Sequence, residues 1–123
     1  MITVIIADDN ALIRRTLEEG LHGLRAVKVV GEAADGQAVV QLAEFLRPTV
    51  VLMDVHMPKL NGIQATRLIR CLSPDTVVVG MSADITPDIR TDILAAGARG
   101  FIRKEDLIPD GLRTIIQEVL DKD

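Results

Sequence analysis

The chain has 123 residues, 48% of them hydrophobic, with 18 acidic against 14 basic residues and a net charge of −4. This length suits a single domain over residues 1–123, and no apolar run approaches the roughly 18 residues of a membrane-spanning helix, so no membrane contact is expected. The acidic balance argues against direct contact of this chain with nucleic acid, and the single cysteine excludes a disulfide framework and favours a cytoplasmic location.

Short runs rich in Val and Ile alternate with longer segments whose apolar residues recur every three or four positions. The runs predict buried strands over Ile2 to Ala7, Lys28 to Glu32, Val50 to Asp54, Val77 to Met81 and Gly100 to Arg103. The longer segments predict helices, one along the stripe Ile13, Leu17, Leu21 and Leu24, then others over Gly36 to Phe45, Gly62 to Cys71, Pro87 to the stop at Gly97, and Pro109 to Leu120. Five strands alternating with five helices predict an α/β doubly wound fold, in which a parallel sheet is covered on both faces.

Three polar residues are placed to cap helices: Asn10 before the first, Asp35 before the second, and Thr86 before the fourth, where Pro87 takes the first helical position. Helical periodicity also assigns the apolar side chains that face the core. These are Val39, Leu42 and Leu46 in the second helix, and Ile63, Leu68 and Ile69 in the third.

The carboxyl ends of the predicted strands carry the residues that could support chemistry, because ligands of doubly wound sheets bind at this edge. The first strand is followed by Asp8 and Asp9, the third ends in Asp54, the fourth leads into Ser82 and the fifth into Lys104. Three carboxylates, a hydroxyl and an ammonium group are therefore predicted to meet at one edge, whereas the end of the second strand adds nothing clear.

Three carboxylates at one edge predict a bound cation. Two of them about 4 Å apart repel by roughly 4 kcal/mol at an effective dielectric constant of about 20, and a divalent cation reverses the sign. Oxygen ligands with few carboxylates favour Mg²⁺ over Ca²⁺. We expect Asp9 as a direct ligand and Asp8 as a direct or water-mediated one, with Asp54 and the backbone carbonyl of His56 completing the protein's share.

A hard cation beside an accessible carboxylate and a fixed lysine suits phosphoryl transfer onto that carboxylate. Asp54 is the predicted nucleophile because it stands alone at the end of a central strand and is followed by a turn. Lys104 would neutralise charge on one phosphoryl oxygen, and Ser82 would donate a hydrogen bond to another.

A set of residues in fixed order carries a resemblance to a known family. The set consists of Asp8 and Asp9, then Asp54 with Met57, Pro58 and Gly62, then Ser82 and Ala83, and finally Gly97, Ala98, Gly100, Phe101 and Lys104. On these residues the chain resembles response-regulator receiver domains of two-component signalling over essentially its full length. The resemblance implies a flavodoxin-like (βα)₅ fold with sheet order 2-1-3-4-5.

The resemblance also implies a function. A sensor histidine kinase or phosphotransfer protein would supply a phosphoryl group from phospho-His, and Asp54 would accept it with Mg²⁺ as cofactor. Ser82 and Phe101 would then act as switch residues, altering the surface of the fourth helix, fifth strand and fifth helix for an output domain or partner, or for a phosphorylation-dependent dimer. Such a domain is a signalling module and catalyses only its own phosphorylation and dephosphorylation.

Three further residues refine this expectation. Glu105 follows Lys104 where proline is frequent in receivers, and with the preceding segment it resembles receivers of LuxR-type transcription regulators, which implies a DNA-binding output domain outside this sequence. Asp84 would disfavour an incoming anion if it points toward the site. Leu12 lies off the apolar stripe of the first helix and is predicted to help dock the phosphodonor.

Other interpretations of the same residues stay open. Asp8 and Asp9 could cap the first helix, and Phe101 could be an ordinary packed aromatic. The main functional alternative is a Mg²⁺-dependent aspartyl-phosphate hydrolase, although His56 stands where such enzymes commonly place a second acid. A flavodoxin-like electron carrier would need a Ser/Thr/Gly-rich phosphate loop and aromatics around a flavin, and this chain has no Trp or Tyr.

Overall fold

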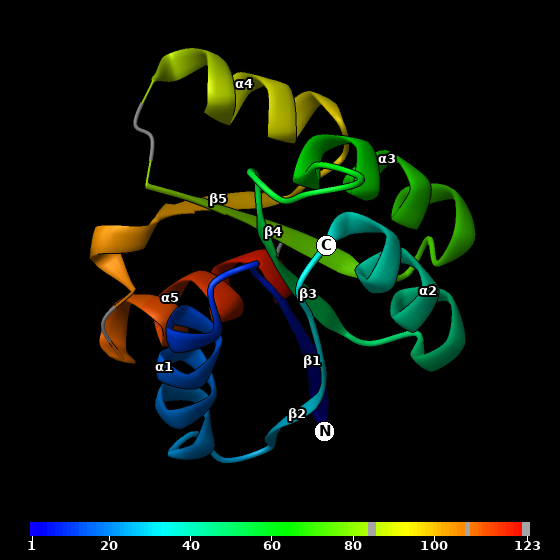
Figure 1. Ribbon diagram of the computed structural model, residues 1–123. Coiled ribbons are helices and arrows are strands. Elements are labelled where there is room, and N and C mark those ends of the chain that lie inside the picture. The colour runs from blue at the N-terminus through cyan, green and yellow to red at the C-terminus, as the bar shows by residue number, and fades with distance from the viewer. Residues whose placement is uncertain (84–85, 108, 122–123) are drawn as a thin grey trace.

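A parallel five-stranded sheet in the order β2-β1-β3-β4-β5 lies between two layers of helices (Figure 1). The computed structural model describes residues 1–83, 86–107 and 109–121. The elements are β1 (Ile2–Ala7), α1 (Ala11–His22), β2 (Val27–Ala33), α2 (Gly36–Leu46), β3 (Val50–Asp54), α3 (Gly62–Leu72), β4 (Val77–Ser82), α4 (Pro87–Ala95), β5 (Gly100–Arg103), the short 3₁₀ helix η1 (Lys104–Asp106) and α5 (Pro109–Leu120).

The predicted elements and the strand order are confirmed. The bounds of β1, β3 and β5 are those predicted, whereas β2 is one residue longer at each end and β4 extends by one residue to include Ser82. Within β2, Val30 is an extra residue, because Val4 pairs with Val29 and the next residue, Ile5, pairs with Gly31. An irregularity of this kind is common at sheet edges, where β2 lies.

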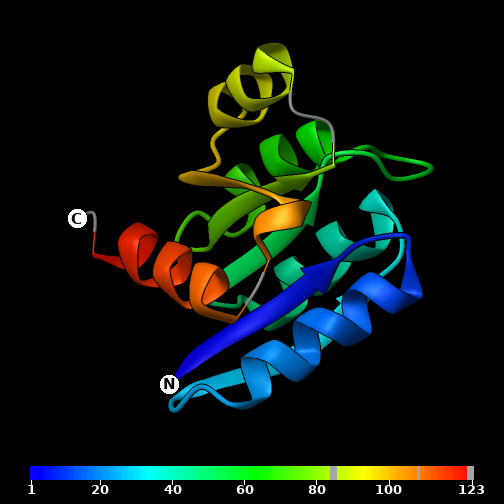
Figure 2. The ribbon, with the colours of Figure 1, turned by 90° about the vertical axis from the view of Figure 1, so that its left-hand side faces the viewer.

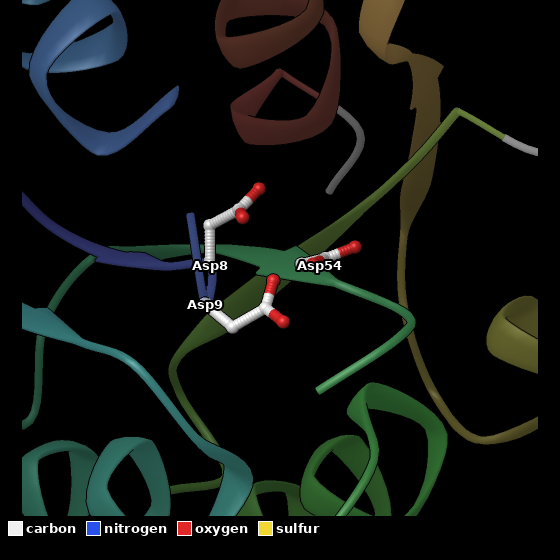
Figure 3. A group of neighbouring side chains, drawn as sticks. All are labelled: Asp8, Asp9 and Asp54. Carbon is white, nitrogen blue, oxygen red and sulfur yellow. The ribbon is translucent and has the colours of Figure 1, made fainter. Parts of the chain in front are cut away.

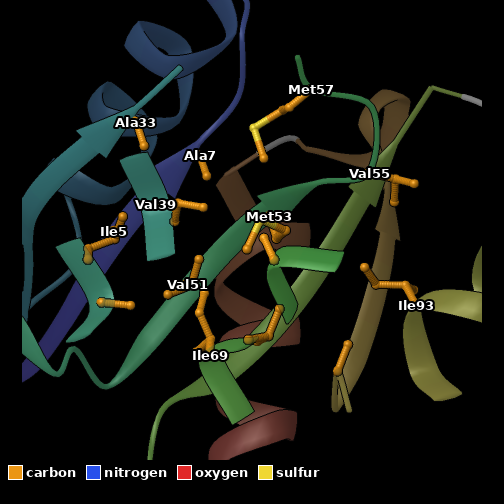
Figure 4. Close-up of a cluster of buried hydrophobic side chains, with 14 residues drawn as sticks. Ile5, Ala7, Ala33, Val39, Val51, Met53, Val55, Met57, Ile69 and Ile93 are labelled. Carbon is orange, nitrogen blue, oxygen red and sulfur yellow. The ribbon is translucent and has the colours of Figure 1, made fainter. Parts of the chain in front are cut away.

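The sheet is apolar on both faces, as a parallel sheet covered by helices requires. Successive side chains of a strand point to opposite faces, so Val4 and Ile6 pack against α1 and α5, while Ile5 and Ala7 face α2 and α3. Figures 1 and 2 show α1 and α5 together on one side of the sheet and α2, α3 and α4 on the other. Figure 4 shows the second of these cores, where Ile69 and Ile93 meet the side chains of β3 and β4.

Two of the three predicted side-chain caps are present, whereas Thr86 precedes α4 without a side-chain capping hydrogen bond. Asn10 Oδ1 accepts hydrogen bonds from the N–H groups of Leu12 and Ile13, and Asp35 Oδ1 accepts one from Ala38. These bonds begin α1 and α2 immediately after the loops that follow β1 and β2. Helix α1 therefore starts within two residues of the acidic pair.

Two core assignments were wrong. Leu46 is 37% exposed and Leu68 is 42% exposed, whereas Ala43 of α2 and Ala65 of α3 are fully buried. Leu46 is the last residue of α2, so it lies over the edge strand β2 beside Gly31, at the margin of the core, and solvent reaches the rest of its side chain. Leu68 lies one residue before the buried Ile69, which rotates it by about 100° around the helix.

The structure also bears on membrane contact. Within the described ranges, none of the helices is long and apolar enough to span a bilayer.

Candidate functional site

Three carboxylates meet at the carboxyl end of the sheet (Figure 3). Asp8 and Asp9 directly follow β1, and Asp54 is the last residue of β3, which is the parallel neighbour of β1. One carboxylate oxygen from each of the three lies within 4.8 Å of the others. Asp8 is fully buried and Asp54 is 3% exposed, whereas Asp9 faces solvent. The topology thus brings together the three carboxylates that the strand ends placed at this edge.

Lys104 closes the site from the side of β5. It is the first residue of η1, directly after the strand, and its Nζ lies 2.7 Å from Asp8 Oδ2 and 3.3 Å from Asp54 Oδ1. Burial alone would lower the pKa of Lys104, but the close contact with Asp8 and the charges of Asp54 and Asp8 outweigh it and raise the pKa. The ammonium group is therefore held in its charged form between two carboxylates.

The carboxyl group of Asp54 is strongly perturbed. Its pKa is raised from 3.8 to about 6, mainly by burial and then by the negative charge of Asp8, while Lys104 and the N–H of His56 act in the opposite direction. That N–H donates to Asp54 Oδ1 at 3.3 Å. A metal cation beside this carboxylate, in addition to the ammonium group of Lys104, would favour the ionised form of Asp54. Cation binding and the ionisation of Asp54 therefore promote each other.

The backbone of Asp54 is held by the start of α3. A Cβ at Gly62 would overlap the carbonyl oxygen of Asp54 and crowd the Cα of Val55, so only glycine permits this approach. In place of a side chain, the Gly62 N–H donates to the carbonyl of Val55 at 2.9 Å, and the N–H of Val55 donates to Met81 at 3.0 Å. The loop after β3 is thus anchored to both β4 and α3.

The surroundings of Asp8 fit a metal ligand. Its N–H donates to the carbonyl of Ala33 at 3.0 Å, and its Oδ1 accepts a hydrogen bond from the N–H of Asn10 at 2.9 Å. Its Oδ2 is buried and makes no hydrogen bond of normal geometry with any residue that the structure describes, although Lys104 Nζ is close. A buried carboxylate oxygen without a regular hydrogen bond, beside two further carboxylates, is an oxygen donor of the kind that Mg²⁺ prefers.

The other predicted site residues lie around this cluster. Ser82 is fully buried at the end of β4 and pairs in register with Arg103, the residue before Lys104. The side chain of His56 faces solvent, and this residue contacts the site through its backbone N–H. Phe101 is half-buried, and its ring fills the space beside Gly80.

Two more predictions concern the rim of the site. Leu12 is 70% exposed in the first turn of α1, next to the acidic pair, so it is accessible to a protein partner. Asp84 lies outside the described residues.

One contact was missed by the sequence reasoning. Arg14 Nη1 donates to the backbone carbonyl of Asp8 at 2.7 Å, and Arg14 Nε pairs with Glu32 at the end of β2 at 3.2 Å. A basic residue one turn into the helix that follows the acidic pair is the signal that could have pointed to it. Glu32 belongs to the same arrangement, so the prediction that the end of the second strand adds nothing clear was wrong.

This geometry agrees with comparisons with known proteins. The model of the response regulator receiver domain matches residues 4–117. The chain belongs to the response regulator receiver family. Among curated proteins, this receiver is 35% identical over 119 residues to the response regulator GacA of Pseudomonas aeruginosa, covering 97% of this chain and 54% of GacA.

Solved structures give the same assignment. The receiver domain of the response regulator NarL from Mycobacterium tuberculosis superposes with a TM-score of 0.90 at 31% identity, covering 98% of both chains. A LuxR-family two-component response regulator from Aurantimonas sp. superposes with a TM-score of 0.89 at 26% identity, covering 96% of this chain and 84% of that one. The predicted resemblance to LuxR-type receivers is confirmed by these relatives.

The receiver spans 29% to 54% of the length of the first curated relatives that it matches. Receivers are signalling modules.

Proposed function

We propose that this receiver is a phosphoacceptor and that Asp54 takes a phosphoryl group from the phospho-His of a sensor kinase or phosphotransfer protein. The observation that carries the proposal is the position of Asp54, which lies at the end of the central strand β3 between two further carboxylates and the ammonium group of Lys104. A carboxylate oxygen of Asp54 would form the new P–O bond. The P–N bond to imidazole would break, and its electron pair would stay on the histidine nitrogen.

The carboxylates of Asp8, Asp9 and Asp54 would hold Mg²⁺, with the backbone carbonyl of His56 as a further ligand. When bound, Mg²⁺ supplies positive charge that offsets the repulsion between the phosphoryl oxygens and the attacking carboxylate. Burial raises the pKa of Asp54 and so favours its protonated form, whereas a nucleophile must be ionised. A bound cation would favour the ionised form and so make Asp54 reactive.

Lys104 and Ser82 would act on the phosphorylated state. The ammonium group of Lys104 already touches Asp8 and Asp54, so it can follow charge that moves from the carboxylate onto a phosphoryl oxygen. Ser82 occupies the adjacent strand end and would donate its hydroxyl hydrogen to another phosphoryl oxygen. Phosphorylation replaces a monoanion with a dianionic group that offers new acceptor oxygens. These oxygens would draw the ammonium group of Lys104 and the hydroxyl group of Ser82 toward the phosphoryl group.

The output would be read on the α4-β5-α5 surface. Phe101 of β5 lies between the buried sheet and a groove beside α4 that is lined by Thr86, Pro87, Arg90 and Thr91. A change in the Phe101 rotamer would alter this groove, which suits an output domain, a downstream protein or a second copy in a phosphorylation-dependent dimer. By analogy with its transcription-regulator relatives we assign the output to transcription regulation, in the cytoplasm, with nucleic acid contacted by another domain.

The alternative function, an aspartyl-phosphate hydrolase acting on separate substrates, has less support. It needs an acid two residues beyond the nucleophile, and that position is His56 with its side chain facing solvent. The family match over residues 4–117 weighs toward the signalling module.

The proposal is tested by intact-mass spectrometry after incubation with a small acyl phosphate. Wild-type protein should gain one phosphoryl group with Mg²⁺ and lose this gain in EDTA, and Asp54→Asn should gain none. Asp75→Asn, which removes an exposed carboxylate from the loop after α3, is the matched control and should be phosphorylated like wild type. A phosphoryl adduct of unchanged yield on Asp54→Asn would overturn the assignment of the nucleophile.

A further inference from the structure

We propose that Arg14 is a positioning residue of the acidic site and that it sets the affinity for the cation by holding the peptide group between Asp8 and Asp9. The inference rests on the proposed function, because it concerns the same Mg²⁺ site. Arg14 lies in the second half-turn of α1 with its side chain 20% exposed, so most of it is buried against the end of the sheet.

The contacts of Asp8 show what Arg14 adds. The N–H of Asp8 is bound by Ala33, its Oδ1 by Asn10 and its Oδ2 is near Lys104. The carbonyl oxygen is the remaining polar atom of this residue, and it accepts a hydrogen bond of 2.7 Å from Arg14 Nη1. Every polar atom of Asp8 therefore has a neighbour, and Arg14 supplies the one on the peptide that leads to Asp9.

The peptide geometry connects this contact to Asp9. A peptide bond is planar, so the carbonyl of Asp8 and the nitrogen and Cα of Asp9 lie in one rigid plane. Asp9 is exposed, unlike Asp8 and Asp54, and packing does little to fix its direction. A guanidinium group that fixes the carbonyl oxygen therefore also fixes the N–Cα bond of Asp9, which restricts the directions that the Asp9 side chain can take.

The guanidinium group is itself anchored. Arg14 Nε pairs with Glu32 Oε1 at 3.2 Å, and Glu32 lies on β2 opposite Ile6 of β1. Arg14 thus joins α1, the loop after β1 and the edge strand through two nitrogens of one planar group. Lysine has a single nitrogen and can reproduce one of these contacts at a time.

Charge and positioning predict opposite effects of removing Arg14. A positive charge near a cation site opposes cation binding, so a purely electrostatic role predicts tighter Mg²⁺ binding when the guanidinium is lost. A positioning role predicts weaker binding, because Asp9 loses its fixed direction. The sign of the change in affinity therefore separates the two roles.

The test is a titration of the whole chain with Mg²⁺, followed by the amide shifts of Asp9 and Asn10 in ¹H–¹⁵N NMR spectra. We expect Arg14→Gln to raise the Kd for Mg²⁺ about tenfold, the lower end of the usual effect of losing a partner that orients a metal ligand. Arg14→Lys, which keeps the charge and one donor, should fall between Arg14→Gln and wild type. Arg15→Gln removes the same charge from an exposed neighbour that pairs with Glu19, and should leave the Kd unchanged.

Two further measurements complete the test. The first is the rate of phosphorylation by a small acyl phosphate at different Mg²⁺ concentrations. In Arg14→Gln the Mg²⁺ concentration for half-maximal rate should rise by a large factor, and the rate at saturating Mg²⁺ should fall by a smaller factor. Urea denaturation in EDTA measures how far the variant is destabilised without metal. Lower stability with an unchanged or tighter Mg²⁺ Kd would overturn the positioning role, and if Arg14→Gln does not fold, the comparison is made with Arg14→Lys.

The same experiments distinguish failure of the proposed function from failure of the Arg14 inference. In the first case wild-type protein would show no Mg²⁺-dependent shifts at Asp9 and Asn10 and no phosphoryl adduct. Failure of the Arg14 inference alone leaves both signals intact in wild type and equal in the Arg14 variants.

Discussion

Replacing Asp54 with asparagine should stabilise the metal-free protein at neutral pH. Asparagine has nearly the shape of the protonated carboxyl group and carries no charge, so it removes the energetic penalty of holding an ionised Asp54 in the buried site. The pKa of Asp54 rises from 3.8 to about 6 on folding, with burial as the main cause. At about 1.4 kcal/mol per pKa unit, the ionised side chain makes the folded state about 3 kcal/mol less stable.

The pH dependence follows from the same values. Between pH 3.8 and about 6 the folded protein binds more protons than the unfolded chain, so the stability of wild type falls as the pH rises through this window. Below pH 3.8 Asp54 is protonated in both states and the difference from Asp54→Asn closes. Above about pH 6 the full difference of about 3 kcal/mol in favour of the variant is expected.

The assay is urea denaturation followed by far-UV circular dichroism, because the chain has no Trp or Tyr for fluorescence. In EDTA at pH 7.5, Asp54→Asn should have the higher free energy of unfolding, and Asp75→Asn should lie within about 0.5 kcal/mol of wild type. Mg²⁺ should stabilise wild type more than Asp54→Asn and narrow the gap, since the variant lacks one ligand. Equal or lower stability of Asp54→Asn in EDTA would refute the reasoning that burial makes the ionised Asp54 unfavourable.

Two other substitutions test parts of the account that lie next to the reacting carboxylate. Leu12→Asp should slow phosphoryl transfer from a cognate kinase about fivefold or more, as loss of an apolar contact in an interface does, while phosphorylation by acetyl phosphate stays intact; equal loss with both donors would argue against docking. Gly62→Ala should lower the free energy of unfolding in urea by about 3 kcal/mol, because its Cβ meets the Asp54 carbonyl. Gly23→Ala, with no atom near the added Cβ, should be close to neutral, and equal effects of the two would contradict the packing argument.

Much of the fold could be predicted from sequence because its signals are local. The Val- and Ile-rich runs of the inner strands β1, β3 and β4 are largely buried on both faces, so each forms a continuous apolar segment, as at Val50–Asp54. The register irregularity at Val30 has no such signal, because it depends on how an edge strand twists against its one neighbour. Leu46 and Leu68 were assigned to the core by hydrophobicity, while the small side chains of Ala43 and Ala65 occupy the positions that the helix geometry buries.

The site was predictable to the extent that it lies at strand ends. Parallel strands bring Asp8, Asp54 and Lys104 to one edge whatever the details of packing. What could not be predicted is the difference in burial between Asp8 and Asp9, since both follow the same strand and only the direction of the peptide between them decides which faces inward. The partnership of Arg14 with Glu32 was missed for a related reason, because it depends on how the side chain of α1 is directed toward the end of β2, and no local pattern records that direction.

The central claim is that Asp54, and no other carboxylate of the cluster, carries the phosphoryl group. Borohydride reduces an aspartyl phosphate to homoserine, which marks the modified position in a peptide map of the acetyl phosphate-treated protein. The account predicts homoserine at position 54 when Mg²⁺ is present and its absence in EDTA. Homoserine at position 8 or 9, or an unmodified Asp54 with Mg²⁺ present, would contradict it.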